Sequence, residues 1–325
     1  MMLGRVFPLT GNILTRDSLA PLGALGLVIA FFSIASPGFL SLLTIQSAAV
    51  QLPELGLLTL AMLLPTLTGG LNLASTFTAN VSGLAAAWVL MRFGGIDAGP
   101  VAFVIGSVAA VSVGAASGYS MGWIIARTKA HPILVSLSMM IFLRGLGEFL
   151  TRGADVSGFP AYVSEIGQGA ILGIPNVLIV FVISLAAVHI ILARMKLGFF
   201  TYLVGSNLEA TRYSGVDTAR TIQLVYMLSG VLSAVAGLVM LTRFNSVRVG
   251  HGESYLLLTI LACFLGNVDP HGGFGRVAPV AIALLVLQLL SSGTNSMGSS
   301  QHLATAIWGF LLLAVMIGGR RARGR

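Results

Sequence analysis

The stretch Gly173-Ile-Pro-Asn-Val-Leu-Ile-Val-Phe-Val-Ile-Ser-Leu-Ala-Ala-Val-His-Ile-Ile-Leu-Ala-Arg194 decides the fold class of this chain. It contains no Asp, Glu, Lys or Arg before its last residue. A helix of about 20 predominantly apolar residues crosses the hydrocarbon core of a bilayer. Because such a helix also satisfies its own backbone hydrogen bonds, we expect a transmembrane helix here.

Composition extends this expectation to the whole chain. Of its 325 residues, 56% are hydrophobic and only 9% are charged, and the mean hydropathy is +0.95. A soluble domain carries about 25% charged residues, so this chain has too few to cover a water-exposed surface. We therefore expect an all-α, polytopic transmembrane helical bundle, with residues 1–325 forming a single transmembrane domain.

Ten apolar runs delimit the candidate spans, with glycine and proline between them. They lie near residues 19–40, 45–67, 72–93, 100–126, 132–151, 173–194, 221–243, 253–268, 276–295 and 302–319. We expect about ten spans, or eight if two glycine-interrupted segments re-enter the membrane. The first run is expected to be an uncleaved span and not a signal peptide, because further spans follow it at once.

Basic residues are distributed unequally between the two sides of these spans. With the N-terminus placed in the cytoplasm, 13 of the 18 Lys and Arg residues fall on the cytoplasmic side. Cytoplasmic loops retain Lys and Arg, so we expect both termini to be cytoplasmic. The net charge of +8 therefore reflects membrane orientation, and no nucleic-acid partner is expected.

Two segments differ from ordinary spans. Thr68-Gly69-Gly70-Leu71-Asn72 and residues 266–273 both place glycines and polar groups beside a long apolar run. Interrupted helices of this kind occur near cavities in transporters. The two segments occupy comparable places in the two halves of the chain, which hints at an internal repeat. Ordinary loops are the alternative.

Few ionisable side chains fall at membrane depth, where each is costly and therefore a candidate site. Glu54 follows Pro53, whose ring removes a helix hydrogen bond and can open a kink toward a pathway. Arg144 and Glu148 are four residues apart, so we expect a structural pair on one helix face.

Neutral polar side chains gather where the third predicted span begins, at Asn72, Ser75, Thr76, Thr78 and Asn80. They suit a hydroxyl-rich solute, although hydrogen bonds within their own helix are the alternative. The candidate translocation residues are Glu54, Thr68, Asn72, Ser75, Thr76 and Asn80.

A short helix is predicted between the sixth and seventh spans. Asn207 can cap its start, Glu209 lies in its first turn, and Gly215 suits the left-handed position that ends it. About two turns are far too short to be stable alone, so packing must hold the helix. We expect Leu208, Tyr213 and Val216 to face the bundle, and Glu209 and Arg212 to face away. The helix is then either a docking surface or a connector lying flat at the membrane interface.

A family resemblance favours the docking surface. The segment Glu209-Ala210-Thr211-Arg212-Tyr213-Ser214-Gly215 resembles the Glu-Ala-Ala-x-x-x-Gly loop of ABC-transporter permeases. Its flanks at residues 197–210 and 214–237 are similar to the ribose-type permeases, which import simple sugars and include relatives for branched-chain amino acids. Residues 68–73 and 132–145 also resemble segments of that subfamily, so the similarity covers nearly the whole chain in order.

The resemblance implies a permease subunit of an ABC importer in the bacterial inner membrane. The short helix would be the coupling helix, within a segment of about residues 199–217, seated in a separate ATP-binding subunit. Gly205, Asn207, Glu209, Ala210, Arg212 and Gly215 would then be the ATPase-coupling residues. No Gly-x-x-x-x-Gly-Lys-Ser/Thr phosphate loop occurs in the sequence, so ATP and Mg²⁺ would bind to the partner. This chain itself is expected to be neither an enzyme nor a cofactor protein.

The resemblance also implies the other partners. They are a second permease copy or a paralogue, in a homodimer or heterodimer, and a periplasmic solute-binding protein. The solute would be a monosaccharide or a related polyol. Two departures from the subfamily pattern stand against a simple transfer. Its Asp after Gly-Gly is Asn72 here, with Ala74-Ser75-Thr76 in place of the following Ser-Val-Gly, and its Gly-Gly-rich cytoplasmic loop is replaced by the different sequence of residues 266–275. They indicate either a divergent ligand or one member of a heteromeric pair.

Other functions are weighed against this one. An ion-coupled secondary transporter for a small polar solute needs intramembrane carboxylates, and only Glu54 and Glu148 are available. An intramembrane enzyme is disfavoured because neither His-Glu-x-x-His nor Gly-x-Ser-x-Gly occurs. A passive channel has no use for a coupling helix.

Overall fold

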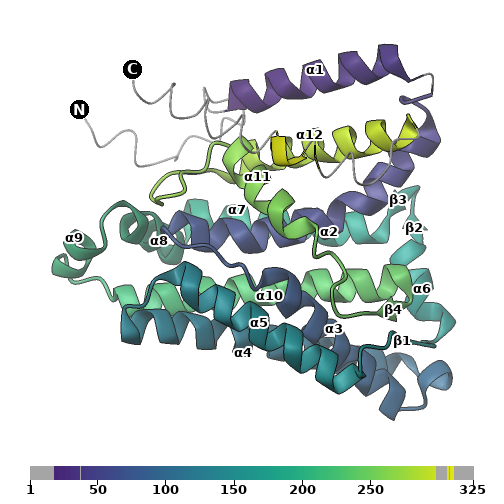
Figure 1. Ribbon diagram of the computed structural model, residues 1–325, viewed down its shortest axis with the longest axis horizontal. Helices are drawn as coiled ribbons and strands as arrows, with labels where there is room; N and C mark the ends of the chain where they lie inside the picture. The colour runs from purple at the N-terminus through teal and green to yellow at the C-terminus, as the bar shows by residue number, and fades with distance from the viewer. Residues whose placement is uncertain (1–17, 37, 298–305, 307, 311–325) are drawn as a thin grey trace.

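The computed structural model describes residues 18–36, 38–297, 306 and 308–310, and these residues form a helical bundle (Figure 1). The helices are α1 (Leu19–Ala35), α2 (Leu42–Leu67), α3 (Ser75–Arg92), α4 (Pro100–Thr128), α5 (Pro132–Thr151), α6 (Ala161–Gln168), α7 (Asn176–Arg194), α8 (Lys196–Ser206), α9 (Leu208–Tyr213), α10 (Thr218–Phe244), α11 (Tyr255–Leu265) and α12 (Val277–Ser296), with a 3₁₀ helix, η3, at Gly95–Asp97. Strand β1 (Val156–Ser157) pairs antiparallel with β4 (Ser246–Val247), and β2 (Ala170–Ile171) with β3 (Ile174–Pro175).

The prediction of an all-helical membrane bundle is confirmed. Nine of the ten predicted runs coincide with helices, and the tenth, at 302–319, lies largely outside the described residues. Six described helices are long and apolar enough to cross a membrane: α2, α4, α5, α7, α10 and α12. The chain is therefore a multi-pass protein, and the count of ten spans stays a prediction.

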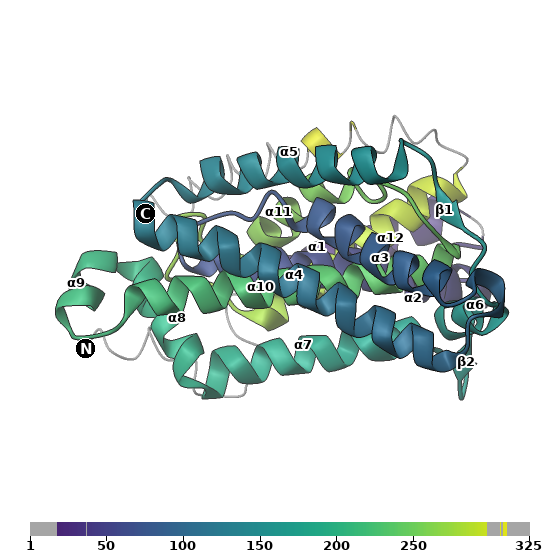
Figure 2. The same ribbon diagram turned by 90° about the horizontal axis from the view of Figure 1, so that it is seen from below.

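The bundle has two distinct ends (Figures 1 and 2). One end carries α8 and α9 and is called the α9 end. The opposite end carries α6 and the four short strands and is called the strand end. Helix α2 runs toward the α9 end, and α10 returns from it toward the strand end.

Helices α2 and α10 form the centre of the bundle. In α2, every residue from 52 to 67 is buried, and α2 packs against α10, α11, α7 and α12. A helix that is apolar on all sides is stable only when other helices surround it. In contrast, α4, α5 and α7 keep mostly exposed apolar surfaces, as membrane-facing helices do.

A row of small residues lets α4 approach its neighbours closely. Gly106, Ala110, Gly114, Gly118 and Gly122 recur every four residues on its buried face. A Cβ atom on Gly118 would overlap the carbonyl oxygen of Tyr226 in α10. Membrane helices associate through such small-residue faces because lipid provides no hydrophobic driving force between them.

The two predicted helix interruptions are present. Residues 68–74 are non-helical between α2 and α3, and residues 266–276 are non-helical between α11 and α12. The interruption after α2 begins at the α9 end and returns to the middle of the bundle, where Asn72 contacts Ser229 of α10. The N–H of Gly273 in the second interruption donates to the carbonyl oxygen of Leu67 over 2.9 Å. The interruptions therefore contact each other, and neither of them lines the cavity described below.

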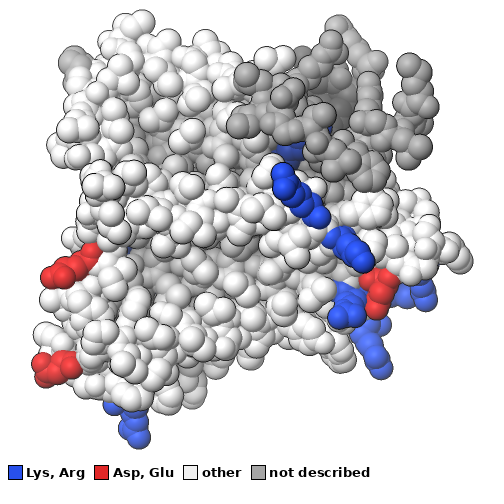
Figure 3. Space-filling view, turned by 180° about the vertical axis from the view of Figure 1, so that it is seen from behind, with Lys and Arg blue, Asp and Glu red and all other residues white. Residues whose placement is uncertain are grey.

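Charge separates along the bundle axis, and Figure 3 shows most of the blue side chains near the α9 end, at the right of that view. Basic residues at the α9 end are Arg127, Lys129, Arg194, Lys196, Arg212, Arg220 and Arg276. Those at the strand end are Arg92, Arg144, Arg152, Arg243 and Arg248, accompanied by Asp97, Glu148, Asp155, Glu165 and Glu253. The excess of basic residues lies at the α9 end, which is the end that faces the cytoplasm if both termini are cytoplasmic. The orientation itself stays a prediction.

Candidate functional site: a docking helix and a polar cavity

Helix α9 is built as its sequence predicts. The N–H of Ala210 donates to Asn207 Oδ1 over 2.9 Å, so Asn207 is the N-cap. Gly215 has φ +82°, which is the left-handed conformation that glycine adopts without strain. The helix spans only six residues, and its start and end are therefore fixed by these local interactions.

Thr211 anchors α9 to α8. Its side chain is buried, and its hydroxyl contacts the carbonyl oxygens of Leu203, at 2.9 Å, and Asn207, at 2.7 Å. The sequence prediction did not identify this anchor. The sequence did contain a signal for this anchor: Thr211 lies four residues after the cap residue Asn207, so its hydroxyl can reach the carbonyl oxygen of that residue.

The predicted inner face of α9 is wrong in part. Leu208 is 44% exposed and Tyr213 is 87% exposed, whereas Val216 is half-buried. The cause is that α9 projects beyond the bundle, so only the side bearing Thr211 meets another element (Figure 1). Glu209 and Arg212 are exposed as predicted. The outer surface of α9 is therefore a mixed apolar and charged surface.

Gly205 of α8 lies where the two helix interruptions meet. A Cβ atom there would overlap the carbonyl oxygen of Leu67 and the backbone nitrogen of Gly273. Tyr202 of α8 donates from its hydroxyl to the carbonyl oxygen of Gly275 over 2.8 Å, and burial raises the pKa of Tyr202 to about 12. The segment that carries α9 is therefore held directly against the end of α2 and the loop before α12.

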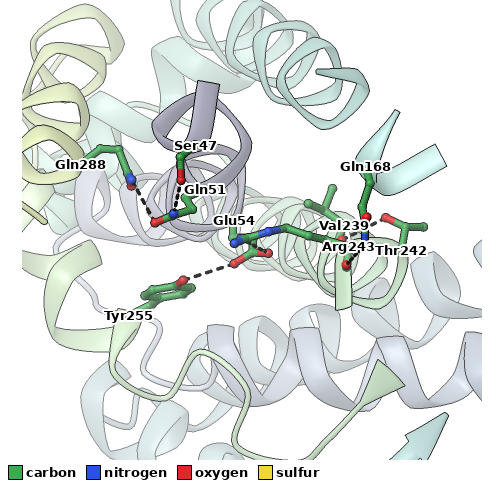
Figure 4. A network of polar contacts seen from close by, with 9 residues as sticks. All are labelled: Ser47, Gln51, Glu54, Gln168, Val239, Thr242, Arg243, Tyr255 and Gln288. Carbon is green, nitrogen blue, oxygen red and sulfur yellow. Dashed lines mark hydrogen bonds and ion pairs between the residues drawn. The ribbon is translucent and has the colours of Figure 1, made fainter. Parts of the chain in front are cut away.

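Glu54 is fully buried in α2 and forms an ion pair. Its Oε1 lies 2.6 Å from Nη1 of Arg243 in α10, and its Oε2 accepts from the hydroxyl of Tyr255 in α11 over 3.2 Å (Figure 4). Gln168 donates from Nε2 to the carbonyl oxygen of Arg243 over 3.2 Å. The carboxylate thus joins three helices, and neither Arg243 nor Tyr255 was predicted as its partner.

A polar cavity of about 380 Å³ lies between α2, α11 and α12, in the strand-end half of the bundle. The side chains with polar atoms that line it are Thr44, Ser47, Gln51, Tyr255, Gln288, Ser291, Ser292, Thr294, Asn295, Ser296 and Trp308. Gln51 donates from Nε2 to Ser47 Oγ over 3.0 Å, and Gln288 donates from Nε2 to Gln51 Oε1 over 3.4 Å (Figure 4).

Two sequence signals could have revealed this cavity. Thr44, Ser47 and Gln51 recur at the spacing of one helix face, before a long and mainly apolar run. The second half of α12 is rich in polar residues, from Gln288 to Ser296, although α12 is otherwise apolar. A span with one polar face at one end is typical of a helix beside a water-filled space.

The other predicted translocation residues lie elsewhere. Asn72 is buried, and its amide donates to Ser229 Oγ over 2.8 Å while its Oδ1 accepts from the N–H of Ala74 over 3.1 Å. Thr68 donates to its own helix, at the carbonyl oxygen of Pro65. None of Thr68, Asn72, Ser75, Thr76 and Asn80 lines the cavity. Their role in translocation stays a prediction.

The predicted pair of Arg144 and Glu148 is present, with 3.0 Å between Nε and Oε1. Nη1 of Arg144 also lies 3.2 Å from Oε1 of Glu253, which links α5 to the loop before α11. All three side chains are about half exposed, so the pair is structural and lies at the surface of the strand end.

Comparison with known proteins identifies the chain. Residues 44–318 match the family described as "Branched-chain amino acid transport system / permease component". The chain is 31% identical to the ribose import permease protein RbsC of Bacillus subtilis, over 94% of this chain and 93% of that protein. It is 30% identical to RbsC of Escherichia coli K12 over 92% of both chains.

A third relative has a different name. The chain is 30% identical to the autoinducer 2 import system permease protein LsrD of Yersinia enterocolitica, over 63% of this chain and 64% of that protein. No solved structure matches this chain significantly. Because the family match covers most of the helical bundle, this chain belongs to the ABC-transporter permeases of the branched-chain amino acid transport system type, which are non-catalytic transmembrane subunits.

Proposed function

We propose that this chain is the membrane-spanning permease of an ATP-driven importer for a monosaccharide or related polyol, which a periplasmic binding protein delivers. Relatives that cover more than nine-tenths of the chain are named ribose import permeases. The importer would lie in the bacterial inner membrane with both termini of this chain in the cytoplasm. The excess of basic residues at the α9 end supports that orientation.

The exposed surface of α9 carries the proposal. Leu208, Glu209, Arg212 and Tyr213 point away from the bundle on a helix that is capped and anchored but too short to be stable alone. Interfaces favour such mixtures of aromatic, apolar and arginine side chains. We infer that this surface docks into a separate ATP-binding subunit, which binds ATP and Mg²⁺.

The remaining coupling residues would act by placing that surface. Asn207 and Gly215 set the two ends of α9, and Ala210 supplies the N–H that Asn207 caps. Gly205 allows α8 to touch the ends of α2 and of the loop before α12. Movement of the ATP-binding subunit would then displace these backbone segments together. Within the membrane, this permease would form a dimer with a second copy of itself or with a paralogue.

The ion-coupled alternative loses support from the pairing of the two carboxylates predicted at membrane depth. Glu54 is buried and paired with Arg243, whereas Glu148, which is paired with Arg144, is half exposed at the surface of the strand end. A carboxylate that binds and releases a coupling ion must exchange its partners during transport, and a buried ion pair resists that exchange. Among the described residues, the spans therefore hold no free carboxylate for a coupling ion.

The test is uptake of D-ribose into proteoliposomes that hold this chain with the ATP-binding subunit and the solute-binding protein that co-purify with it. Uptake is expected to require enclosed ATP and to be unaffected by a proton gradient. Glu209→Ala and Gly215→Ala are expected to lose uptake or the ATPase subunit, while the chain still inserts. Uptake that continues without the ATPase subunit, or that follows the proton gradient, would overturn the proposal.

A further inference from the structure

The cavity between α2, α11 and α12 has a chemistry that the proposed function does not specify. None of the described residues that line it is charged. Hydroxyl and amide side chains supply most of its polar atoms, and its volume of about 380 Å³ falls in the range of small-molecule sites, about 300–1,000 Å³. It lies in the strand-end half, which the proposed orientation turns toward the periplasm.

The amide side chains retain unused hydrogen-bonding capacity. Gln288 Nε2 lies 3.4 Å from Gln51 Oε1 and 3.5 Å from Ser292 Oγ, which are long contacts. Each glutamine carries two N–H donors and an oxygen with two lone pairs. A solute hydroxyl, which both donates and accepts, can therefore bind between these groups without leaving a buried polar atom unpaired.

Trp308 adds a free donor at the same cavity. Its side chain is 7% exposed, and its Nε1 has no hydrogen-bond partner within the part of the chain that the structure describes. A buried N–H without an acceptor is costly, so an acceptor supplied by a bound molecule would relieve that cost. A hydroxyl oxygen is such an acceptor.

The charges closest to the cavity are already satisfied. Tyr255 lines the cavity and donates from its hydroxyl to Glu54, and Glu54 is neutralised by Arg243. An amino acid zwitterion would bring an ammonium and a carboxylate into a space with no described charged partner for either group. Burial of unpaired charges is strongly unfavourable, so the cavity selects against such a solute.

We propose that this cavity is a solute subsite for a neutral, polyhydroxylated molecule, with Gln51, Gln288, Ser292 and Trp308 as its hydrogen-bonding groups and Tyr255 as one wall. This inference rests on the proposed transport function. It adds the location of the site and a selection for uncharged hydroxyl groups over zwitterionic amino acids.

Cysteine protection tests the site. The single cysteine of this chain, Cys263, is fully buried, so the wild-type permease chain, separated from its partners after labelling, supplies the unlabelled baseline for a charged methanethiosulfonate reagent. Ser291→Cys and Asn295→Cys place thiols in the cavity beside the proposed hydrogen-bonding groups, and Ser157→Cys places one on exposed strand β1 at the same end. The rates are measured on the assembled transporter in detergent with D-ribose, ribitol or L-leucine present.

D-ribose or ribitol is expected to slow modification at residues 291 and 295 several-fold, and L-leucine to leave it unchanged. No solute should affect Ser157→Cys. The inference is overturned if the cavity cysteines do not react while Ser157→Cys does, if neither polyol protects them, or if L-leucine protects them equally.

Uptake measured on the same preparation separates the two proposals. If ATP-driven uptake is present but the cavity cysteines are unprotected, only the subsite is wrong. If no uptake depends on the ATP-binding subunit, the proposed function is wrong, whatever the labelling shows. A second variant, Gln288→Asn, keeps the amide but shortens its reach, and it is expected to reduce protection at Ser291→Cys without loss of the assembled complex.

Discussion

The backbone N–H of Gly273 donates a hydrogen bond of 2.9 Å to the carbonyl oxygen of Leu67, and this bond joins the loop before α12 to the end of α2. Gly205 of α8 lies against both groups. The contact is made by backbone atoms, which cannot rotate away as side chains can. A displacement of α8 therefore acts on both helices at once.

Gly205→Ala is predicted to separate ATP hydrolysis from transport. Its Cβ would overlap two backbone groups, so α8 must shift away from α2 and the loop before α12. Uptake is expected to fall at least about tenfold, equivalent to about 1.4 kcal/mol in the transition-state barrier, while ATP hydrolysis persists. Both rates are measured in the same proteoliposomes.

Gly145→Ala is the matched control for that variant. It lies in α5, and a Cβ there meets nothing within 4 Å. Its uptake and hydrolysis are expected to equal those of the wild type. Wild-type uptake by the Gly205→Ala protein would show that close contact at this junction is not needed.

Tyr213→Ala is predicted to weaken binding of the ATP-binding subunit without harming the fold. Tyr213 is 87% exposed on α9, so its side chain contributes little to packing within this chain. An aromatic anchor at an interface is worth about 2 kcal/mol or more, or about a thirtyfold change in Kd. Kd is measured by titrating the subunit onto immobilised permease.

Leu172→Ala serves as the control, because Leu172 is 97% exposed at the strand end, far from α9 (Figure 1). It should leave Kd unchanged. Equal Kd values for the Tyr213→Ala and wild-type proteins would place the docking surface elsewhere.

Sequence reasoning succeeded where the decisive contacts are local. The Asn207 cap and the Arg144–Glu148 pair each join residues no more than four positions apart in the sequence. The left-handed conformation of Gly215 depends on the φ angle of that residue alone. The interruptions after α2 and α11 were also evident, because glycine and polar residues break an apolar run.

It failed where the partners come from distant helices. Arg243 was placed at a span end by its position in the sequence, and nothing local links it to Glu54. The cavity needs one wall from each of α2, α11 and α12, so no single segment shows it. The direction of Tyr213 depended on how far α9 projects, which the amphipathic pattern of six residues cannot determine.

The buried ion pair of Glu54 and Arg243 gives a prediction about stability. Glu54→Gln leaves the Arg243 guanidinium without its counter-charge, and removal of one partner of a buried pair costs about 3–5 kcal/mol. The double variant Glu54→Gln/Arg243→Gln is expected to recover part of this loss, because no unpaired charge remains. The free energy of unfolding is measured in mixed micelles.

The exposed pair provides the comparison. Glu148→Gln removes one of the two carboxylate partners of Arg144, whose side chain is 50% exposed, so the expected loss of stability is much smaller than that of Glu54→Gln. If Glu54→Gln cost no more than Glu148→Gln, the central pair would not be a buried structural link between α2 and α10.

Asn72→Asp tests why this chain has an amide where the ribose-type pattern has a carboxylate. The amide of Asn72 donates to Ser229 Oγ over 2.8 Å, and that hydroxyl donates to the carbonyl oxygen of Ala61 over 2.6 Å. An aspartate has no N–H to donate, so Ser229 must turn its proton either to the carboxylate or to Ala61. One buried oxygen then loses its partner, at a cost of about 1–3 kcal/mol. Ser229→Ala combined with Asn72→Asp should cost less than the sum of the two single variants, because both changes break the same hydrogen-bonded chain; strictly additive losses would show that the two side chains are not coupled.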